Sequence, residues 1–286
     1  MTAVNGLGDD TGGASAVSAW RRCAANVATA LTLLARPPRI HPQAPWVRSP
    51  RRLALAVAVI VAVLVIGMLF IDPPTTRAVV RMPHWLVSLF DDITDYGKSG
   101  WFLWPLGLLF LFLAALPPLA PRFAQLVLAA MMVRVGFLFT AIAVPSLFVT
   151  IVKRMIGRAR PLVTGHVDPF VFSPFVWRAD YASFPSGHAT TAFAALVAFG
   201  TLWPRARTAF LIYALLIAAS RIVLLAHYPT DVLAGAVTGI VGALMVRRWF
   251  ALRLLGFSIG PDGVPHQYPG PSLKRVKAVA RDLLAP

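Results

Sequence analysis

The stretch LALAVAVIVAVLVIGMLFI, Leu53–Ile71, contains no charged side chain and directly follows Arg51 and Arg52. About 20 consecutive apolar residues are needed for an α-helix to cross the hydrocarbon layer of a bilayer. A helix is suited to that layer because it pairs all of its own backbone polar groups. The sequence therefore predicts a transmembrane helix over 53–71.

Further apolar runs follow along the chain. The run from Phe123 to Val152 is too long for one span and is interrupted by Arg134. The part between Arg134 and Lys153 corresponds to about 27 Å of helix, close to the hydrocarbon thickness. The predicted fold class is all-α: a polytopic membrane protein with six transmembrane helices and a core helical bundle. The six predicted spans cover 53–71, 101–119, 135–152, 186–203, 208–226 and 231–246.

The composition supports this class. Hydrophobic residues make up 58% of the chain and charged residues only 13%, too few to cover a soluble protein of this size. The net charge is +16, and all eleven acidic residues are Asp. In a membrane protein this excess indicates anionic lipid surfaces and cytoplasmic loops, and no nucleic-acid-binding motif accompanies it. The single cysteine, Cys23, excludes an intrachain disulfide and a Cys-based metal site.

The distribution of Lys and Arg predicts the orientation. Both ends of the chain are basic, which predicts that both termini are cytoplasmic and that the number of spans is even. The loop from Lys153 to Pro185 would then lie on the periplasmic or extracellular side of the cell (inner) membrane, although it is also basic. Because this loop breaks the charge rule, we expect its cations to serve chemistry. The basic residues of the two ends are Arg21, Arg22, Arg36, Arg39, Arg48, Arg51, Arg52, Arg247, Arg248, Arg253, Lys274, Arg275, Lys277 and Arg281.

Three segments are expected along the chain. Residues 1–52 form a cytoplasmic N-terminal segment, 53–248 a six-helix membrane domain, and 249–286 a basic cytoplasmic tail. Within the first segment, apolar residues recur at helical spacing between Ser15 and Arg36. This amphipathic pattern is typical of a helix on a membrane surface, and equally of one packed against the protein's own cytoplasmic side.

A further amphipathic pattern, HWLVSLFDDITDYGKSG, spans His84 to Gly100 in the first external loop. It predicts a short helix at the outer interface. Such a helix could cover the mouth of a site or only pack on the protein surface.

Most of the remaining polar residues fall in three short segments: KRMIGRARP (Lys153–Pro161), FPSGHATT (Phe184–Thr191) and SRIVLLAHYPTDVLAG (Ser220–Gly235). Helix counting places all three at the outer ends of predicted spans. Each residue taken alone fits a simpler role, such as a cation that extends to lipid phosphates. Together they indicate one site.

The residue types in these segments suit a phosphate. Lys153, Arg160 and Arg221 supply three cations, and guanidinium groups bind tetrahedral oxyanions through paired hydrogen bonds. Ser186 and Gly187 begin a predicted helix, where unpaired backbone N–H groups and the helix dipole favour an anion. The Ser186 hydroxyl could cap the helix or donate to a ligand.

Two histidines, His188 and His227, complete the set. One imidazole can attack phosphorus while the other protonates the leaving oxygen. Asp231 could reach back to a ring N–H of His227 and select its tautomer. The same three residues are also suitable metal ligands, but three nearby cations would oppose a divalent ion, so we expect no metal and no cofactor.

At these residues the chain resembles the type 2 phosphatidic acid phosphatase superfamily, whose site is shared with vanadium haloperoxidases. The pattern K-x6-R-P matches Lys153 to Pro161, P-S-G-H matches Pro185 to His188, and S-R-x5-H-x3-D matches Ser220 to Asp231. The resemblance implies His227 as nucleophile, His188 as acid and then base, and Asp231 as the residue that orients His227. It implies phosphoryl binding by Lys153, Arg160, Ser186, Gly187 and Arg221.

The expected function is a metal-independent membrane phosphatase that hydrolyses a lipid phosphate or diphosphate through a phosphohistidine at the outer interface. Candidate substrates are undecaprenyl diphosphate, phosphatidylglycerol phosphate, phosphatidic acid and lipid A phosphates. Two alternatives remain: a lipid phosphotransferase on the same scaffold, and a non-catalytic lipid-binding protein. The complete residue set disfavours the second. A haloperoxidase is disfavoured because those relatives are soluble.

Overall fold

The computed structural model describes residues 11–40, 49–117 and 121–284, so parts of the predicted N-terminal segment, 1–10 and 41–48, lie outside it. The regular secondary structure of the described residues is helical apart from one antiparallel hairpin, in which Ser258 faces His266, and one isolated bridge between Arg158 and Phe172. The helices are α1 (Thr11–Ala35), α2 (Pro50–Phe70), α3 (Asp72–Val79), α4 (His84–Thr94), α5 (Gly100–Ala115), α6 (Arg122–Ile156), α7 (Gly187–Leu202), α8 (Arg207–Val223), α9 (Pro229–Leu252) and α10 (Leu273–Leu284); η1 (Asp95–Gly97), η2 (Ala179–Tyr181) and η3 (Pro204–Ala206) are single turns; the strands are β1 (Phe257–Ile259) and β2 (Pro265–Gln267).

Five helical segments in the described residues are long and apolar enough to cross a membrane. They are α2, the segment from α4 through α5, α6, the segment from η3 through α8, and α9. The chain is therefore a polytopic membrane protein. The remaining predicted span corresponds to α7, which is apolar but only 16 residues long.

Several predicted boundaries were wrong. The predicted span over 135–152 lies within a 35-residue helix, α6, that includes Arg134. The guanidinium donates to the carbonyl oxygens of Ala130 and Tyr268, each at 2.9 Å, so this cation is accommodated without breaking the helix. Helix α5 ends at Ala115, just before Pro117, because the residue before a proline is disfavoured in helical conformation.

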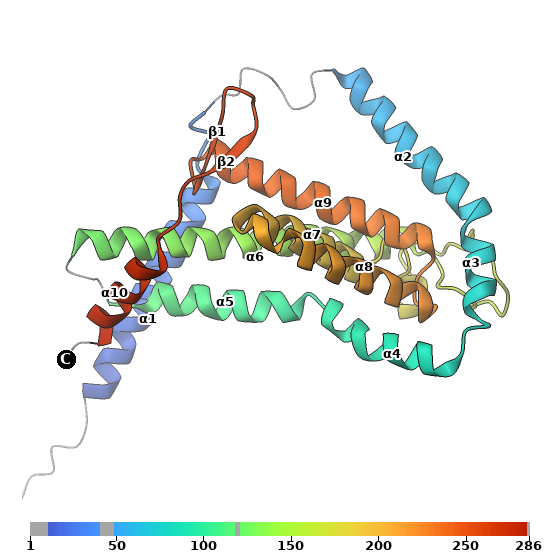
Figure 1. The fold of residues 1–286 in the computed structure, drawn as a ribbon, viewed down its shortest axis with the longest axis horizontal. Helices are drawn as coiled ribbons and strands as arrows, with labels where there is room; N and C mark the ends of the chain where they lie inside the picture. The colour runs from blue at the N-terminus through green and yellow to red at the C-terminus, as the bar shows by residue number, and fades with distance from the viewer. Residues whose placement is uncertain (1–10, 41–48, 118–120, 285–286) are drawn as a thin grey trace, which may run out of the picture.

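Helix α7 lies in the core of the bundle and packs against α6, α8 and α9 (Figure 1). Glycines on α9 allow a close approach of the two helices. A Cβ atom at Gly239 would lie 2.3 Å from the carbonyl oxygen of Thr190, and one at Gly235 would lie 2.4 Å from that of Ser186. This contact brings the N-terminus of α7 against the N-terminus of α9, where the Ser186 N–H donates to the Asp231 carbonyl oxygen at 2.9 Å.

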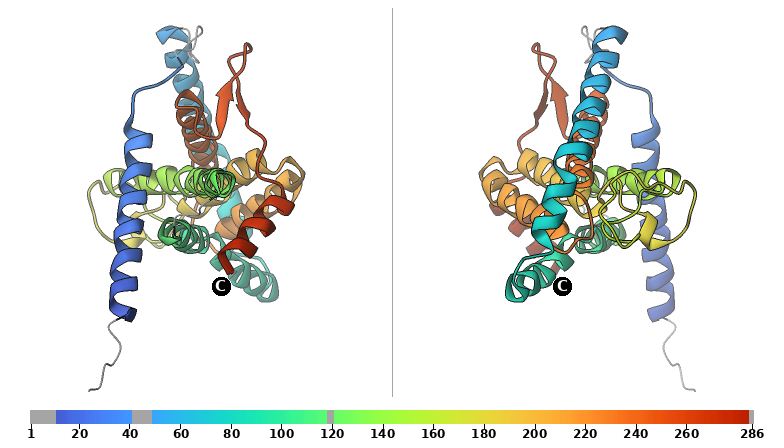
Figure 2. Two further views of the ribbon diagram at one scale, coloured as in Figure 1. Left: turned by 90° about the vertical axis from the view of Figure 1, so that its left-hand side faces the viewer. Right: turned by 90° about the vertical axis from the view of Figure 1, so that its right-hand side faces the viewer.

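Helix α1 runs across the direction of α6 (Figure 2) and packs against α5. The Asn26 side chain donates to the Ala114 carbonyl oxygen at 2.8 Å, and Arg22 contacts the Ala115 carbonyl oxygen at 3.4 Å. The amphipathic helix therefore packs against the protein along one side. Trp20 and Leu31 remain exposed on its other side.

Helix α2 leans away from the bundle (Figure 1) and exposes most of its side chains. It approaches the core near Gly67, where a Cβ atom would lie 2.7 Å from the Thr230 side chain. The chain then turns directly into α3, whose first residue, Asp72, is completely buried. This turn places the Asp72 carboxylate at the end of the bundle where the three polar segments lie.

Candidate functional site

The three polar segments lie at one end of the bundle, at the C-terminal end of α6, the N-termini of α7 and α9, and the C-terminal end of α8. The Lys153 amine lies 3.6 Å from the position that a Cβ of Gly187 would take. The charges of Arg221, His227 and Lys153 all act on His188, and that of Arg160 acts on Lys153. The structure therefore brings together the residues that the sequence singled out.

His227 is buried, and its Nδ1 lies 2.7 Å from the carbonyl oxygen of Ser183. Because a carbonyl oxygen only accepts, Nδ1 must carry the proton and Nε2 keeps its lone pair. Burial lowers the pKa of His227 below its ordinary value of 6.5, and the Asp231 charge opposes this shift. The imidazole is therefore held neutral, in the tautomer that leaves Nε2 free to act as a nucleophile.

Asp231 was predicted to bond to this ring directly, but its Oδ2 lies 3.8 Å from His227 Nδ1, beyond hydrogen-bond length. The carboxylate instead accepts from the Ser183 hydroxyl at 2.5 Å and from the Tyr228 N–H at 2.8 Å. Ser183 thus bonds the carboxylate with its side chain and the imidazole with its carbonyl. Asp231 is thus linked to His227 through this intervening serine, and its negative charge acts on the ring.

Arg158 is a site component that the sequence did not identify. Its guanidinium is fully buried and donates to Asp231 Oδ1 at 2.5 Å and to Asp72 Oδ2 at 2.8 Å. It also donates to Thr230 Oγ1 at 2.8 Å and stacks over the Tyr228 ring at 4.4 Å. This cation holds the Asp231 carboxylate beside His227.

Two sequence signals could have pointed to this pair. Asp72 follows the first apolar run immediately, where a lone acid is unusual, and Arg158 lies within the polar segment that also contains Arg160. Their pairing could not be derived from spacing, because the two residues belong to distant parts of the chain.

Three buried polar atoms at this end have no hydrogen-bond partner among the described residues: Arg160 Nε, Ser186 Oγ and Arg221 Nε. Buried polar atoms are normally satisfied, so such donors at one place indicate a ligand-binding surface. The Ser186 hydroxyl does not cap α7, which leaves it available to a ligand. Together with the first-turn N–H groups of α7, these donors suit a tetrahedral oxyanion.

The segment around α4, for which the sequence left open a role as a cover of the site, lies against candidate site residues. The Arg221 guanidinium donates to Thr94 Oγ1 at the end of α4. In the following turn, a Cβ atom at Gly97 would lie only 2.8 Å from His188 Cδ2. This segment therefore packs over two of the candidate site residues.

Comparison with known proteins finds relatives of this chain. Residues 134–254 match the family model described as the PAP2 superfamily. The lipid A 1-phosphatase of Rhizobium johnstonii is 33% identical over 226 residues, covering 77% of this chain and 92% of that protein.

Two solved structures are also similar. LpxE from Aquifex aeolicus has 23% identity and a TM-score of 0.44, over 60% of this chain and 92% of that one. The PAP2-type phosphatidylglycerolphosphate phosphatase from Bacillus subtilis has 20% identity and a TM-score of 0.45, over 80% and 95%. The identity to the Rhizobium enzyme, over most of both chains, decides the assignment: the chain belongs to the PAP2 superfamily of membrane lipid phosphatases.

Proposed function

We propose that this enzyme hydrolyses a lipid phosphate monoester through a phosphohistidine on His227. The observation that carries the proposal is the bond from His227 Nδ1 to the Ser183 carbonyl, which leaves Nε2 as the free nucleophilic nitrogen. Donors without protein partners lie at the same end of the bundle, on Arg160, Ser186 and Arg221. A neutral imidazole beside an oxyanion-binding surface is what the attack on phosphorus requires.

In the first step the substrate phosphoryl oxygens bind Lys153, Arg160, Arg221, the Ser186 hydroxyl and the backbone at Gly187. His227 Nε2 attacks phosphorus and forms the N–P bond while the bond to the lipid oxygen breaks. His188 donates its proton to that oxygen, and the dephosphorylated lipid leaves as an alcohol. The positive charge that develops on His227 is stabilised by Asp231, which lies 3.8 Å away.

In the second step His188, now neutral, removes a proton from water, and the oxygen attacks the phosphohistidine. The N–P bond breaks, inorganic phosphate leaves, and both histidines return to their starting states. Apart from water, every group that this proposed sequence requires is a side chain or backbone group of the protein, so the proposed reaction uses no metal.

The proposed substrate is the 1-phosphate of lipid A, because the curated relative that is 33% identical carries the name lipid A 1-phosphatase. Phosphatidylglycerol phosphate, phosphatidic acid and undecaprenyl diphosphate are the alternatives to compare. All of them keep a hydrocarbon tail in the bilayer while the phosphate reaches the end of the helices.

We propose that α7 also spans the membrane, which brings the number of spans to six, and that residues 53–248 form the phosphatase domain. A 16-residue helix is about 24 Å long, short for a span, but α7 lies inside the bundle and needs little contact with lipid. With six spans, both basic ends face the cytoplasm and the site faces the periplasm or cell exterior. A cysteine-accessibility scan at exposed positions on the two ends would test this orientation.

The experiment for the function is phosphate release by purified enzyme from each of these lipids, with EDTA present. We expect lipid A to lose one phosphate at the highest rate. Activity that persists in His227→Ala would remove His227 as the nucleophile. Identification of the phosphate acceptor, with labelled substrate, separates hydrolysis from transfer to a second lipid.

A further inference from the structure

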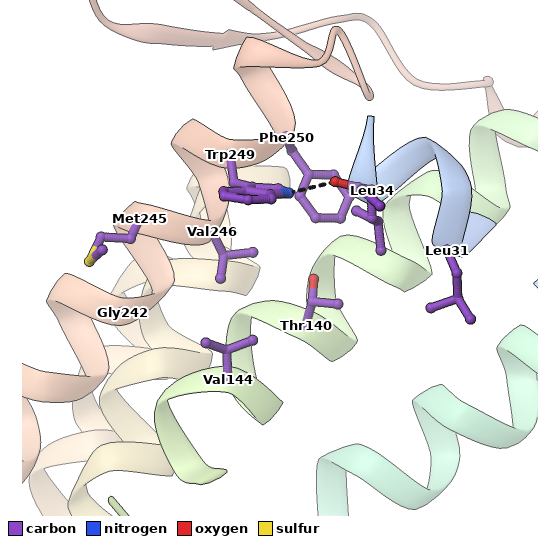
Figure 3. A pocket seen from close by; sticks show the side chains of 10 residues that line it. Leu31, Leu34, Thr140, Val144, Gly242, Met245, Val246, Trp249 and Phe250 are labelled. Carbon is purple, nitrogen blue, oxygen red and sulfur yellow. Dashed lines mark hydrogen bonds between the residues drawn. The ribbon is translucent and has the colours of Figure 1, made fainter. Parts of the chain in front are cut away.

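A cavity lies toward the opposite end of the bundle, between α1, α6 and α9. Its volume is about 530 Å³. Figure 3 shows the side chains that line it, and the Trp249 Nε1–H donates to the Leu34 carbonyl oxygen at 3.1 Å between two of its walls. Eighteen residues of α9 separate Trp249 from Asp231, which is about 27 Å of helix. The cavity is therefore distinct from the candidate active site.

The lining is almost entirely hydrocarbon. It comprises Leu31 and Leu34 of α1, Val144 of α6, and Val246 and Phe250 of α9, with the Thr140 hydroxyl bonded to the backbone of its own helix. Val144 and Leu31 are both more than half exposed, so the cavity opens as a groove on the outside of the protein. In a membrane such a groove admits a hydrocarbon chain.

Two arginines adjoin the lining of this groove and are called its rim: Arg253 lies over Trp249, and Arg36 follows Ala35. The Arg253 guanidinium lies over the Trp249 ring at 3.6 Å and is only 4% exposed, and its Nε has no partner among the described residues. Arg36 donates from Nη2 to the Arg253 carbonyl oxygen, and its own Nε is also buried without a partner.

Within the described part of the chain, no carboxylate pairs with these arginines. The positive charges of Arg39 and Arg253 act on Arg36, and none of the three forms an ion pair with another residue in 11–40, 49–117 or 121–284. Clustered like charges repel, and buried unpaired donors are costly, so an anion at this rim would relieve both effects.

We propose that the groove and its arginine rim bind an anionic phospholipid, with the phosphate on Arg36 and Arg253 and one acyl chain along Leu34, Val144 and Trp249. The rim supplies charge complementarity, and the groove supplies an apolar surface continuous with it. Such a lipid contacts both α1 and α9 and stabilises the packing of the N-terminal helix on the bundle.

The first experiment measures thermal unfolding of the full chain in detergent micelles that contain added lipid. Phosphatidylglycerol should raise the unfolding temperature in a saturable manner. Phosphatidylcholine, which has the chains without net charge, and inorganic phosphate, which has the anion without chains, should each produce a much smaller rise. Equal effects of the two lipids, or a full effect of phosphate alone, would overturn the proposal.

Variants then locate the effect. Arg36→Gln removes one rim cation, and Val144→Trp fills the groove from an exposed position. Each should weaken the apparent affinity for phosphatidylglycerol about tenfold, as expected for loss of a charge-assisted contact or of the acyl chain.

Matched controls lie on the same helices. Arg21→Gln removes an exposed charge from α1, and Leu147→Trp places the same new side chain at an exposed position of α6 outside the groove. Both should bind phosphatidylglycerol as the unmodified protein does. If Arg36→Gln and Val144→Trp also retain the full affinity, the lipid binds elsewhere and the assignment of this groove is wrong.

Discussion

The guanidinium of Arg158 joins the carboxylates of Asp72 and Asp231, with bonds of 2.8 and 2.5 Å, and all three side chains are completely buried. One carboxylate follows the first span, the cation follows α6, and the other carboxylate begins α9. This bridge therefore ties the turn after α2 to the residue that supports His227.

Arg158→Met should destabilise the protein by about 3–5 kcal/mol, because it leaves two buried carboxylates without their cation. Activity should fall as well, since Asp231 would lose the bond that holds it beside His227. Thermal unfolding and phosphate release of the purified variant are the measurements.

The control for this change is Arg178→Met, which breaks the exposed ion pair between Arg178 and Asp180. An exposed pair contributes little, so a loss below about 1 kcal/mol is expected. Similar losses in the two variants would show that the buried bridge has no special structural role.

His188→Ala should reduce the turnover of a lipid phosphate by about 10²–10⁴-fold, because the leaving alkoxide would lack its proton donor. A substrate with a phenolic leaving group, such as p-nitrophenyl phosphate, needs less assistance, so the first step should lose much less. Trapping of phosphorylated enzyme in single-turnover experiments would measure this step directly.

His227→Ala, measured with the same lipid phosphate and p-nitrophenyl phosphate, is the variant to compare with His188→Ala. This variant should form no phosphoenzyme from either compound, since the attacking nitrogen is gone. Loss of activity that is equal for both leaving groups in His188→Ala would contradict the assigned role of His188.

The pH dependence of kcat/KM should have an acidic limb centred below pH 6.5. Burial lowers the pKa of His227, so the neutral nucleophile is present above this lowered pKa and is lost as the pH falls through it. Rates measured between pH 4 and 9, on either lipid or p-nitrophenyl phosphate, would locate the limb.

Asp231→Asn tests whether the Asp231 charge sets the position of this acidic limb. The Asp231 charge raises the pKa of His227, so its removal should move the limb further to acid while it lowers the maximum rate. A limb that moves toward neutral pH in this variant would contradict the electrostatic role of Asp231.

Gly235→Ala should impair both folding and activity. The new Cβ would lie 2.4 Å from the Ser186 carbonyl oxygen, so α7 would have to move away from α9 and displace Ser186. A loss of about 1–3 kcal/mol in stability is expected from such overpacking. Unfolding temperature and phosphate release report the two effects.

Gly136→Ala on α6 is the matched control, because its Cβ would meet Phe110 at 3.5 Å, an ordinary contact. It should be neutral or slightly stabilising, since alanine favours the helix. Equal tolerance of alanine at Gly235 and Gly136 would mean that close approach of α7 and α9 is not required.

The sequence by itself determined that the chain crosses the membrane repeatedly, and it singled out the polar segments that the fold brings together at one end of the bundle. Both are local properties: a run of apolar residues partitions into hydrocarbon wherever it occurs, and the spacing within PSGH or KRMIGRARP is preserved in any fold. The family assignment followed from these motifs and is confirmed by the relatives.

Only the tertiary structure decided how these pieces meet. Asp72 bonds Arg158 because α3 turns under the N-terminus of α9, and His227 bonds the Ser183 carbonyl because the loop before α7 passes beside it. Helix α1 packs against α5, and its C-terminal end lines the groove together with α9. These contacts depend on the distances at which helices cross. Such distances are set where small residues such as Gly235 pack against the backbone of a distant segment. No local pattern in the sequence encodes that packing.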